Sequence, residues 1–157
     1  MLALTAASAG AQSVRRQQIK TEWVHEQGRV LVEAAASTDT LAVVILYFSD
    51  EYRVHNASFQ LAPEEARAFA DSVVAFMSRD TVRAPSGQTL ESVGPEFVKD
   101  DWRFGVMRYA RGRSNNFIWW AGGPVDRVSF QLNVNRTRAL AASLKTAADA
   151  AEAMLKP

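Results

Sequence analysis

The residues best suited to bind a ligand lie between Trp102 and Trp120. This stretch holds four arginines, no acidic residue and six aromatic residues interleaved with them. Aromatic faces stack on bases, and guanidinium groups meet phosphates and other anions. We therefore expect any working surface, for an anionic ligand, a polysaccharide or a protein, to be an arginine–aromatic face. Its members would be Arg103, Arg108, Arg111, Arg113, Tyr109 and Trp119 or Trp120.

Strand alternation supports only part of this interpretation. Trp102, Phe104 and Val106 would share one face of a strand, and Arg108 falls on that same side, whereas Arg103 and Tyr109 fall on the other. The same pattern is typical of an ordinary amphipathic strand, in which arginines face solvent or lie over aromatic rings. That alternative stays open.

The two histidines, His25 and His55, are both expected in strands. With Glu26 they would supply the residue types of a two-histidine, one-carboxylate metal site. No spacing motif of the kind His-Glu-x-x-His brings them together, so surface histidines are the simpler interpretation and we expect no metal site. A hydrolase assembled from His25, His55 and carboxylates is the enzyme-class alternative.

Other catalytic signals are missing from the sequence. Asp100 and Asp101 would point to opposite faces of a strand, and Glu64 and Glu65 suit the start of a helix. The chain has no cysteine and no nucleophile elbow, Walker loop or dinucleotide-binding glycine motif. We therefore expect a non-enzymatic protein without catalytic residues or cofactor.

A doubled segment organises the elements that must position these residues. Ser58 to Ser72 and Ser129 to Ser143, 71 residues apart, agree at eight of fifteen positions. In both copies Ser-Phe-Gln-Leu leads into an amphipathic helical pattern, with Arg67 matched by Arg138. Such self-similarity at a fixed offset predicts two related halves.

Hydrophobic patterns predict the strands and the helix of each half. The first half should contain strands over 19–25, 29–36, 41–48 and 52–61, followed by a helix from Pro63 to about Arg79. The run at 41–48 is continuously apolar, which suits a strand covered on both faces. The second half should contain an edge or broken strand over 90–98, strands over 102–110, 116–121 and 125–132, and a helix capped by Asn133 or Asn135. We expect an α+β fold: antiparallel sheet from two β4-α halves, with both helices packed on it.

Composition and length bound the domain organisation. At 157 residues, with 48% hydrophobic and 22% charged residues, the chain has the make-up of a globular domain, and no apolar run is long enough to cross a membrane. We expect one domain over 12–157, with half-repeats over about 18–79 and 88–156 and a linker at 80–89. Residues 12–80 carry 7 basic and 10 acidic side chains (net −3), and residues 81–157 carry 11 and 7 (net +4). This asymmetry favours an anionic partner or pairing of like chains in a homo-oligomer.

The first eleven residues are small, apolar and uncharged and end in Ala9-Gly10-Ala11. This pattern resembles the hydrophobic region and cleavage site of a bacterial secretory signal peptide. It predicts a mature chain that begins near Gln12 in the periplasm or outside the cell.

Element order also supports a family resemblance. Two four-stranded units, each followed by a helix, resemble the Whirly/PC4 group of single-stranded DNA-binding proteins, and Phe59-x-Leu61-x-Pro63-Glu64-Glu65 is similar to their passage from strand to helix. The resemblance implies single-stranded nucleic-acid binding through a sheet. Export would separate the protein from chromosomal DNA, so our first hypothesis is an exported binding or structural module, and nucleic-acid binding is the second.

Overall fold

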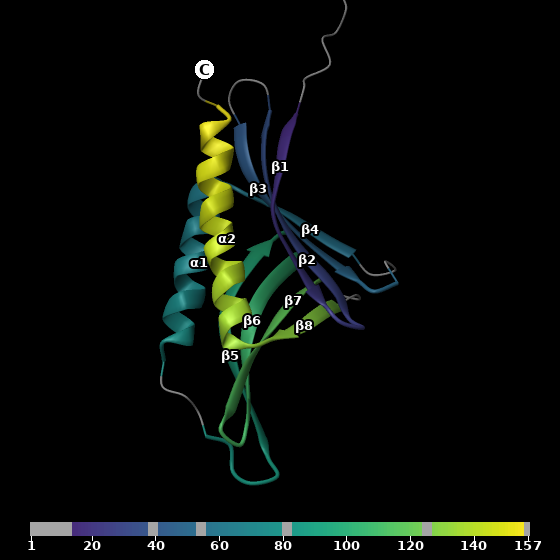
Figure 1. The fold of residues 1–157 in the computed structure, drawn as a ribbon, viewed down its shortest axis with the longest axis vertical. Helices are drawn as coiled ribbons and strands as arrows, with labels where there is room; N and C mark the ends of the chain where they lie inside the picture. The colour runs from purple at the N-terminus through teal and green to yellow at the C-terminus, as the bar shows by residue number, and fades with distance from the viewer. Residues whose placement is uncertain (1–13, 38–40, 53–55, 80–82, 124–126, 156–157) are drawn as a thin grey trace, which may run out of the picture.

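The computed structural model describes residues 14–37, 41–52, 56–79, 83–123 and 127–155. Its elements follow the order of two β4-α units (Figure 1). The first unit consists of β1 (Arg15–Val24), β2 (Gly28–Ser37), β3 (Leu41–Asp50), β4 (Asn56–Leu61) and α1 (Pro63–Met77). The second consists of β5 (Thr89–Lys99), β6 (Trp102–Arg111), β7 (Ser114–Gly122), β8 (Arg127–Leu132) and α2 (Val134–Ala153).

Each unit forms one antiparallel four-stranded meander, in the orders β1-β2-β3-β4 and β5-β6-β7-β8. The expected α+β architecture is confirmed. The two copies of the repeated sequence, 71 residues apart, form matching strands. β4 and β8 begin and end at equivalent positions and have the same alternation of exposed and buried residues. The duplicated sequence therefore corresponds to a duplicated strand-to-helix unit.

Several strand limits differ from expectation. β1 begins at Arg15, earlier than its apolar pattern suggested, because β2 provides partners along its whole length. Tyr52 lies in a turn and not in β4. The strand at 89–99 is an edge strand, as expected, and Gly94-Pro95 lies where its register with β6 shifts. In the 41–48 run, Val44, Leu46 and Phe48 are fully buried on the core side, and on the other side Ile45 is buried whereas Val43 and Tyr47 are half-buried.

Both helices begin as their sequences dictate. Pro63 occupies the first turn of α1, and the Glu65 carboxylate accepts a hydrogen bond from the Ala62 N–H at 2.8 Å. Asn133 caps α2, where its side chain accepts a hydrogen bond from the Arg136 N–H at 2.9 Å. The expected cap at Asn133 is confirmed.

The helices tie the two units together. α2 packs on β1, β2 and β3 of the first unit, whereas α1 packs on β5 of the second unit as well as on β3 and β4. The two helices run side by side in opposite directions (Figure 1). Arg67 near the start of α1 donates to Glu152 and Asp149 near the end of α2, each at 2.7 Å, and these hydrogen bonds raise the pKa of its guanidinium. Lys145 pairs with Asp71 one turn farther along.

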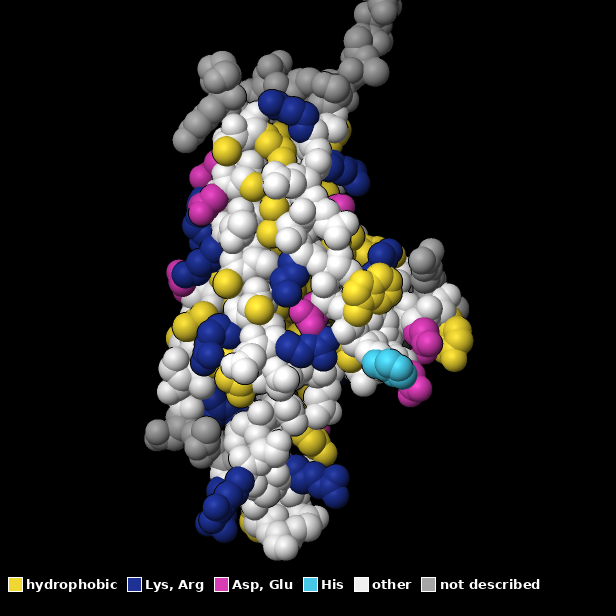
Figure 2. Space-filling model, in the orientation of Figure 1, with side chains coloured by type: hydrophobic (Ala, Val, Ile, Leu, Met, Phe, Trp, Pro, Cys, Tyr) yellow, Lys and Arg dark blue, Asp and Glu magenta, His cyan; other side chains and the backbone are white. Residues whose placement is uncertain are grey.

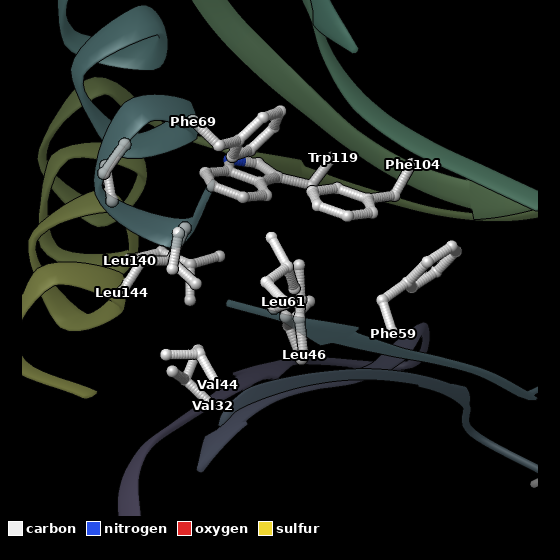
Figure 3. Close-up of a cluster of buried hydrophobic side chains, with 14 of the residues drawn as sticks. Val32, Val44, Leu46, Phe59, Leu61, Phe69, Phe104, Trp119, Leu140 and Leu144 are labelled. Carbon is white, nitrogen blue, oxygen red and sulfur yellow. The ribbon is translucent and has the colours of Figure 1, made fainter. Parts of the chain in front are cut away.

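A single hydrophobic cluster, in which aromatic rings lie among aliphatic side chains, fills the space between the sheets and the helices (Figure 3). The rings of Phe59 and Phe69 each lie 4.7 Å from that of Phe104, so one ring of the second sheet contacts the first sheet and a helix together. Phe48 contacts both members of the duplicated pair, Phe59 at 6.3 Å and Phe130 at 6.4 Å. The two copies thus face the same core.

Some expectations concern segments outside the described residues. The leader at 1–11, His55 and the first residues of the linker at 80–82 belong to this group. Among the residues that the structure describes, no helix has the length and apolar character needed to span a membrane.

The shared core predicts that the two units unfold together. Phe104→Ala removes a fully buried ring from contact with Phe48, Phe59, Phe69 and Phe97, and we expect it to lower the free energy of unfolding by about 3–5 kcal/mol. Urea denaturation followed by circular dichroism and by tryptophan fluorescence should give one coincident transition.

Val93→Ala, at a side chain 75% exposed on β5, is the matched control and should change stability by no more than about 0.5 kcal/mol. Two separate transitions, or equal effects of the two substitutions, would contradict a common core.

Candidate functional site

The arginine–aromatic stretch is divided between the two faces of the second sheet. On β6, Phe104, Val106 and Arg108 point to the core, whereas Arg103 and Tyr109 point away from the helices. On β7, Trp119 points inward and Trp120 outward. The expected alternation holds along both strands, so only some of the predicted ligand-binding residues share a surface.

Arg108 is a structural residue. Its side chain is buried, and one terminal nitrogen donates hydrogen bonds to the carbonyl oxygens of Phe76 at 2.8 Å, Met77 at 3.3 Å and Arg79 at 3.2 Å. Its guanidinium carbon also lies 5.2 Å from the Phe76 ring centroid and 5.6 Å from that of Phe117. α1 has no basic residue in its last turn, so Arg108 supplies the positive charge that the carbonyl end of this helix favours.

Trp119 is equally unavailable to a ligand. Its side chain is fully buried, and its ring lies 6.1 Å from that of Phe69 on α1. Within the described residues its indole nitrogen has no hydrogen-bond partner. Arg108 and Trp119 therefore do not belong to a ligand-binding surface. Trp119 is packed in the core, and the Arg108 guanidinium is bound to the carbonyl oxygens at the end of α1.

Arg103, Tyr109, Arg111 and Trp120 belong to the outer face of the second sheet, which is the side turned away from both helices, and Arg113 lies in the turn between β6 and β7. A hollow of about 380 Å³ opens on this face, and we call it the outer hollow. It is lined by Val93, Glu96, Arg103, Met107, Trp120, Gly122, Gly123 and Arg127.

A stacked arginine and tryptophan form one wall of the outer hollow. The Arg127 guanidinium carbon lies 4.4 Å from the centroid of the Trp120 ring, within the range of a cation–π contact. Gly105 is paired with Trp120 across the strands, and a Cβ atom added there would lie 3.0 Å from the indole and 2.8 Å from the Pro95 carbonyl oxygen. Glycine at position 105 thus leaves the space that the Trp120 indole occupies.

Arg103 lies across the hollow from this stack. It forms an ion pair with Glu96 at 3.2 Å, and both side chains are partly exposed. Glu96 is the one acidic residue among the hollow's lining residues, so Arg103 and Arg127 give the hollow a net positive charge. A small anion or an anionic group of a larger ligand fits this charge balance.

Arg111 and Arg113 lie away from the hollow, at the far end of the same sheet. Both belong to the end of β6 and its turn into β7, which lies near the lower end of the molecule beside the start of β5 (Figure 1). Figure 2 shows Lys and Arg side chains on both sides of that end. Arg83 joins Arg113 around a second hollow, of about 390 Å³.

Sequence reasoning missed Arg127. Arg127 lies in the next strand, seven residues after Trp120, so its contact with the indole depends on the register of β7 and β8. The pairing of Gly122 with Arg127 places the arginine one row from Trp120. The only available signal was the outward position of Arg127 in the alternating strand at 125–132.

The alternative site of two histidines is not assembled within the described residues. His25 lies in the turn after β1, with its side chain 90% exposed and 3.7 Å from Glu26. His55 lies outside the described residues. In the described ranges no group of three or more histidine, cysteine, aspartate or glutamate side chains has the arrangement needed to hold a metal ion.

Comparison with known proteins gives no family assignment. No protein-family model matches the chain, and no curated protein matches it. The function therefore has to be argued from the residues of the outer face.

The two kinds of arginine on β6 lead to a stability prediction. Arg108→Met leaves the carbonyl oxygens at the end of α1 without their buried donor, and we expect the free energy of unfolding to fall by about 2–3 kcal/mol in urea denaturation. Arg111→Met, an exposed position on the same strand, should change it by no more than about 0.5 kcal/mol. Equal losses of unfolding free energy in the two variants would contradict the capping role of Arg108.

Proposed function

We propose that the protein is an exported, non-enzymatic binding module whose outer hollow takes an anionic group of its ligand. The observation that carries this proposal is the Arg127 guanidinium, whose central carbon lies over the Trp120 ring at 4.4 Å from its centroid, beside the open hollow. A stacked guanidinium keeps its N–H donors in the plane of the group, where they can form the forked pair of hydrogen bonds that carboxylates and phosphates accept.

The surroundings of Arg127 leave this donor set for a ligand. In the described part of the chain, its hydrogen-bond partner is the sulfur of Met107 at 3.6 Å, and thioether sulfur is a weak acceptor. Arg103, in contrast, already has a carboxylate partner in Glu96. Arg127 is therefore the primary anion-binding residue, and Arg103 adds charge at the opposite wall.

The chemistry of the hollow supports binding without catalysis. Its one carboxylate, Glu96, is neutralised by Arg103, and histidine, serine, threonine and lysine are absent from the lining residues. Among those lining residues there is thus no pair of groups that could act as nucleophile and general base.

Export is the part of the proposal that rests on sequence alone. The support is the uncharged apolar segment that ends in Ala9-Gly10-Ala11, which matches the small-residue cleavage pattern of a signal peptide. A periplasmic or secreted protein meets acidic polysaccharides and other anionic envelope components, which are ligands of the class that the outer hollow suits.

Single-stranded nucleic-acid binding is the second candidate. The observation that favours it is the pair of four-stranded sheets, each followed by a helix, which is the element order of the Whirly/PC4 resemblance. Base stacking needs an exposed aromatic face. Trp120 lies between Gly105 and Arg127, so a base would have to displace the arginine before it could stack on this ring.

Substitution of Arg127 tests the proposed site. Arg127→Gln should weaken binding of polygalacturonate or heparin by about tenfold, the equivalent of one charge-assisted hydrogen-bonded contact, in calorimetric titration at low salt. The matched control is Arg29→Gln, which removes a guanidinium from over Trp23, at 5.2 Å, on the first sheet.

Three outcomes decide between the candidates. Loss in Arg127→Gln but not in Arg29→Gln supports the outer hollow, and equal loss in both variants contradicts it. The third outcome is that oligo-dT binds more tightly than either polysaccharide at the same ionic strength and quenches tryptophan fluorescence, with quenching that weakens as salt rises. That outcome would favour single-stranded nucleic-acid binding over the first candidate.

Export has a direct test of its own. When the full chain is expressed in a bacterium with its native leader, intact-mass spectrometry of the periplasmic fraction or medium should show a mature protein that begins at Gln12. An uncleaved Met1 and retention inside the cell would remove the export proposal and leave the binding site to be judged separately.

A further inference from the structure

The outer hollow is one end of a longer lane across the second sheet. Arg103 and Arg111 lie on the same face of β6 and eight residues apart, which corresponds to about 26 Å along a strand. Arg127 lies in the row of Arg103, because Gly122 of β7 pairs with both residues. Arginines therefore mark both ends of one continuous face.

The middle of this lane is uncharged. Between the two ends, β6 contributes Met107 and Tyr109, which pair across the strands with Ile118 and Asn116 of β7. On the side of β8, the outward residues Ser129 and Gln131 are also uncharged and exposed. The lane therefore offers an uncharged surface, partly polar and partly apolar, over which an anionic polymer can lie without repulsion from acidic side chains.

Among the described strand residues of this face, the acidic ones lie along one edge of the lane. Glu91 and Glu96 both belong to the edge strand β5, and Glu96 is paired with Arg103. They stand opposite Tyr109 and Gly105 respectively, one strand away from β7. A polyanion would therefore be steered toward β6 and β7, away from the β5 edge.

The far end of the lane concentrates positive charge. Arg111 and Arg113 flank Gly112 in the β6–β7 turn, and Arg83 lines a hollow of about 390 Å³ with Arg113. The Ala84 N–H donates to the Gly112 carbonyl oxygen at 3.1 Å, so the segment that carries Arg83 is fixed to this turn. Residues 83–90 and 110–118 contain no acidic side chain, and basic side chains lie on both sides of this end in Figure 2.

We infer that the ligand is a linear acidic polysaccharide of the polyuronate type, which runs along β6 and β7 from the outer hollow to the arginine turn. This inference rests on the proposed function of the hollow and adds the ligand's chemical class and minimum length. A compact anion would use one end only, whereas a polymer with repeated carboxylates engages both. Carboxylates match the guanidinium fork, and a polymer without bases needs no exposed aromatic face.

Binding of oligogalacturonates of increasing length tests the lane. Oligomers too short to span about 26 Å should bind weakly and with similar affinity, and those long enough to reach both ends should bind at least tenfold more tightly, since the second contact becomes intramolecular. Arg111→Gln combined with Arg113→Gln should reduce the affinity of the long oligomers to that of the short ones.

Arg138→Gln, at an exposed position on α2, controls for the loss of positive charge. Affinity that does not increase with length, or a double variant that behaves like Arg138→Gln, would overturn the lane while leaving the outer hollow intact. Arg127→Gln tests the hollow separately and should abolish binding of the short oligomers. If the short oligomers bind this variant as well as they bind the wild type, the proposed function itself is overturned. Tighter binding of oligo-dT than of an oligogalacturonate with the same number of charges would overturn the choice of polysaccharide.

Discussion

The fold depends on a core that neither four-stranded unit can complete alone. Each sheet has one strongly apolar face, and a single helix covers too little of it to exclude water. The structure meets this constraint by packing α2 on the first sheet and α1 against β5 of the second, with Phe104 in contact with Phe59 and Phe69 at the centre. Since the helices connect the two sheets, separation of the units would expose both inner faces together.

This arrangement decides where a ligand can bind. The inner faces and the helices between them are committed to packing, and Arg108, the one buried arginine among the described residues, caps α1. Within the described strands, recognition side chains therefore have to lie on the outer faces. On the second sheet those side chains include two arginines and an indole around a hollow, and the outward side chains between Arg103 and Arg111 on β6 are uncharged.

Much of the fold was predictable because its signals are local or repeated. The doubled Ser-Phe-Gln-Leu segment, the proline at the start of α1 and Asn133 at the start of α2 each predicted an element that the structure contains. The binding surface was less accessible. Alternation placed Arg103 and Tyr109 on one face, but it could not show that Arg108 reaches the carbonyls of α1, because helix and strand are about thirty residues apart and meet only through tertiary packing.

The contact of Arg127 with Trp120 shows how the candidate site is built and why it could not be predicted from the sequence. Three conditions meet there: a glycine at position 105 that leaves room for the indole, a β7–β8 register that places Arg127 one row away, and a sulfur atom of Met107 as its weak partner. None of these is visible in one stretch of sequence. Each residue alone is an ordinary strand residue, and only their pairing across three strands brings the guanidinium over the indole beside the hollow.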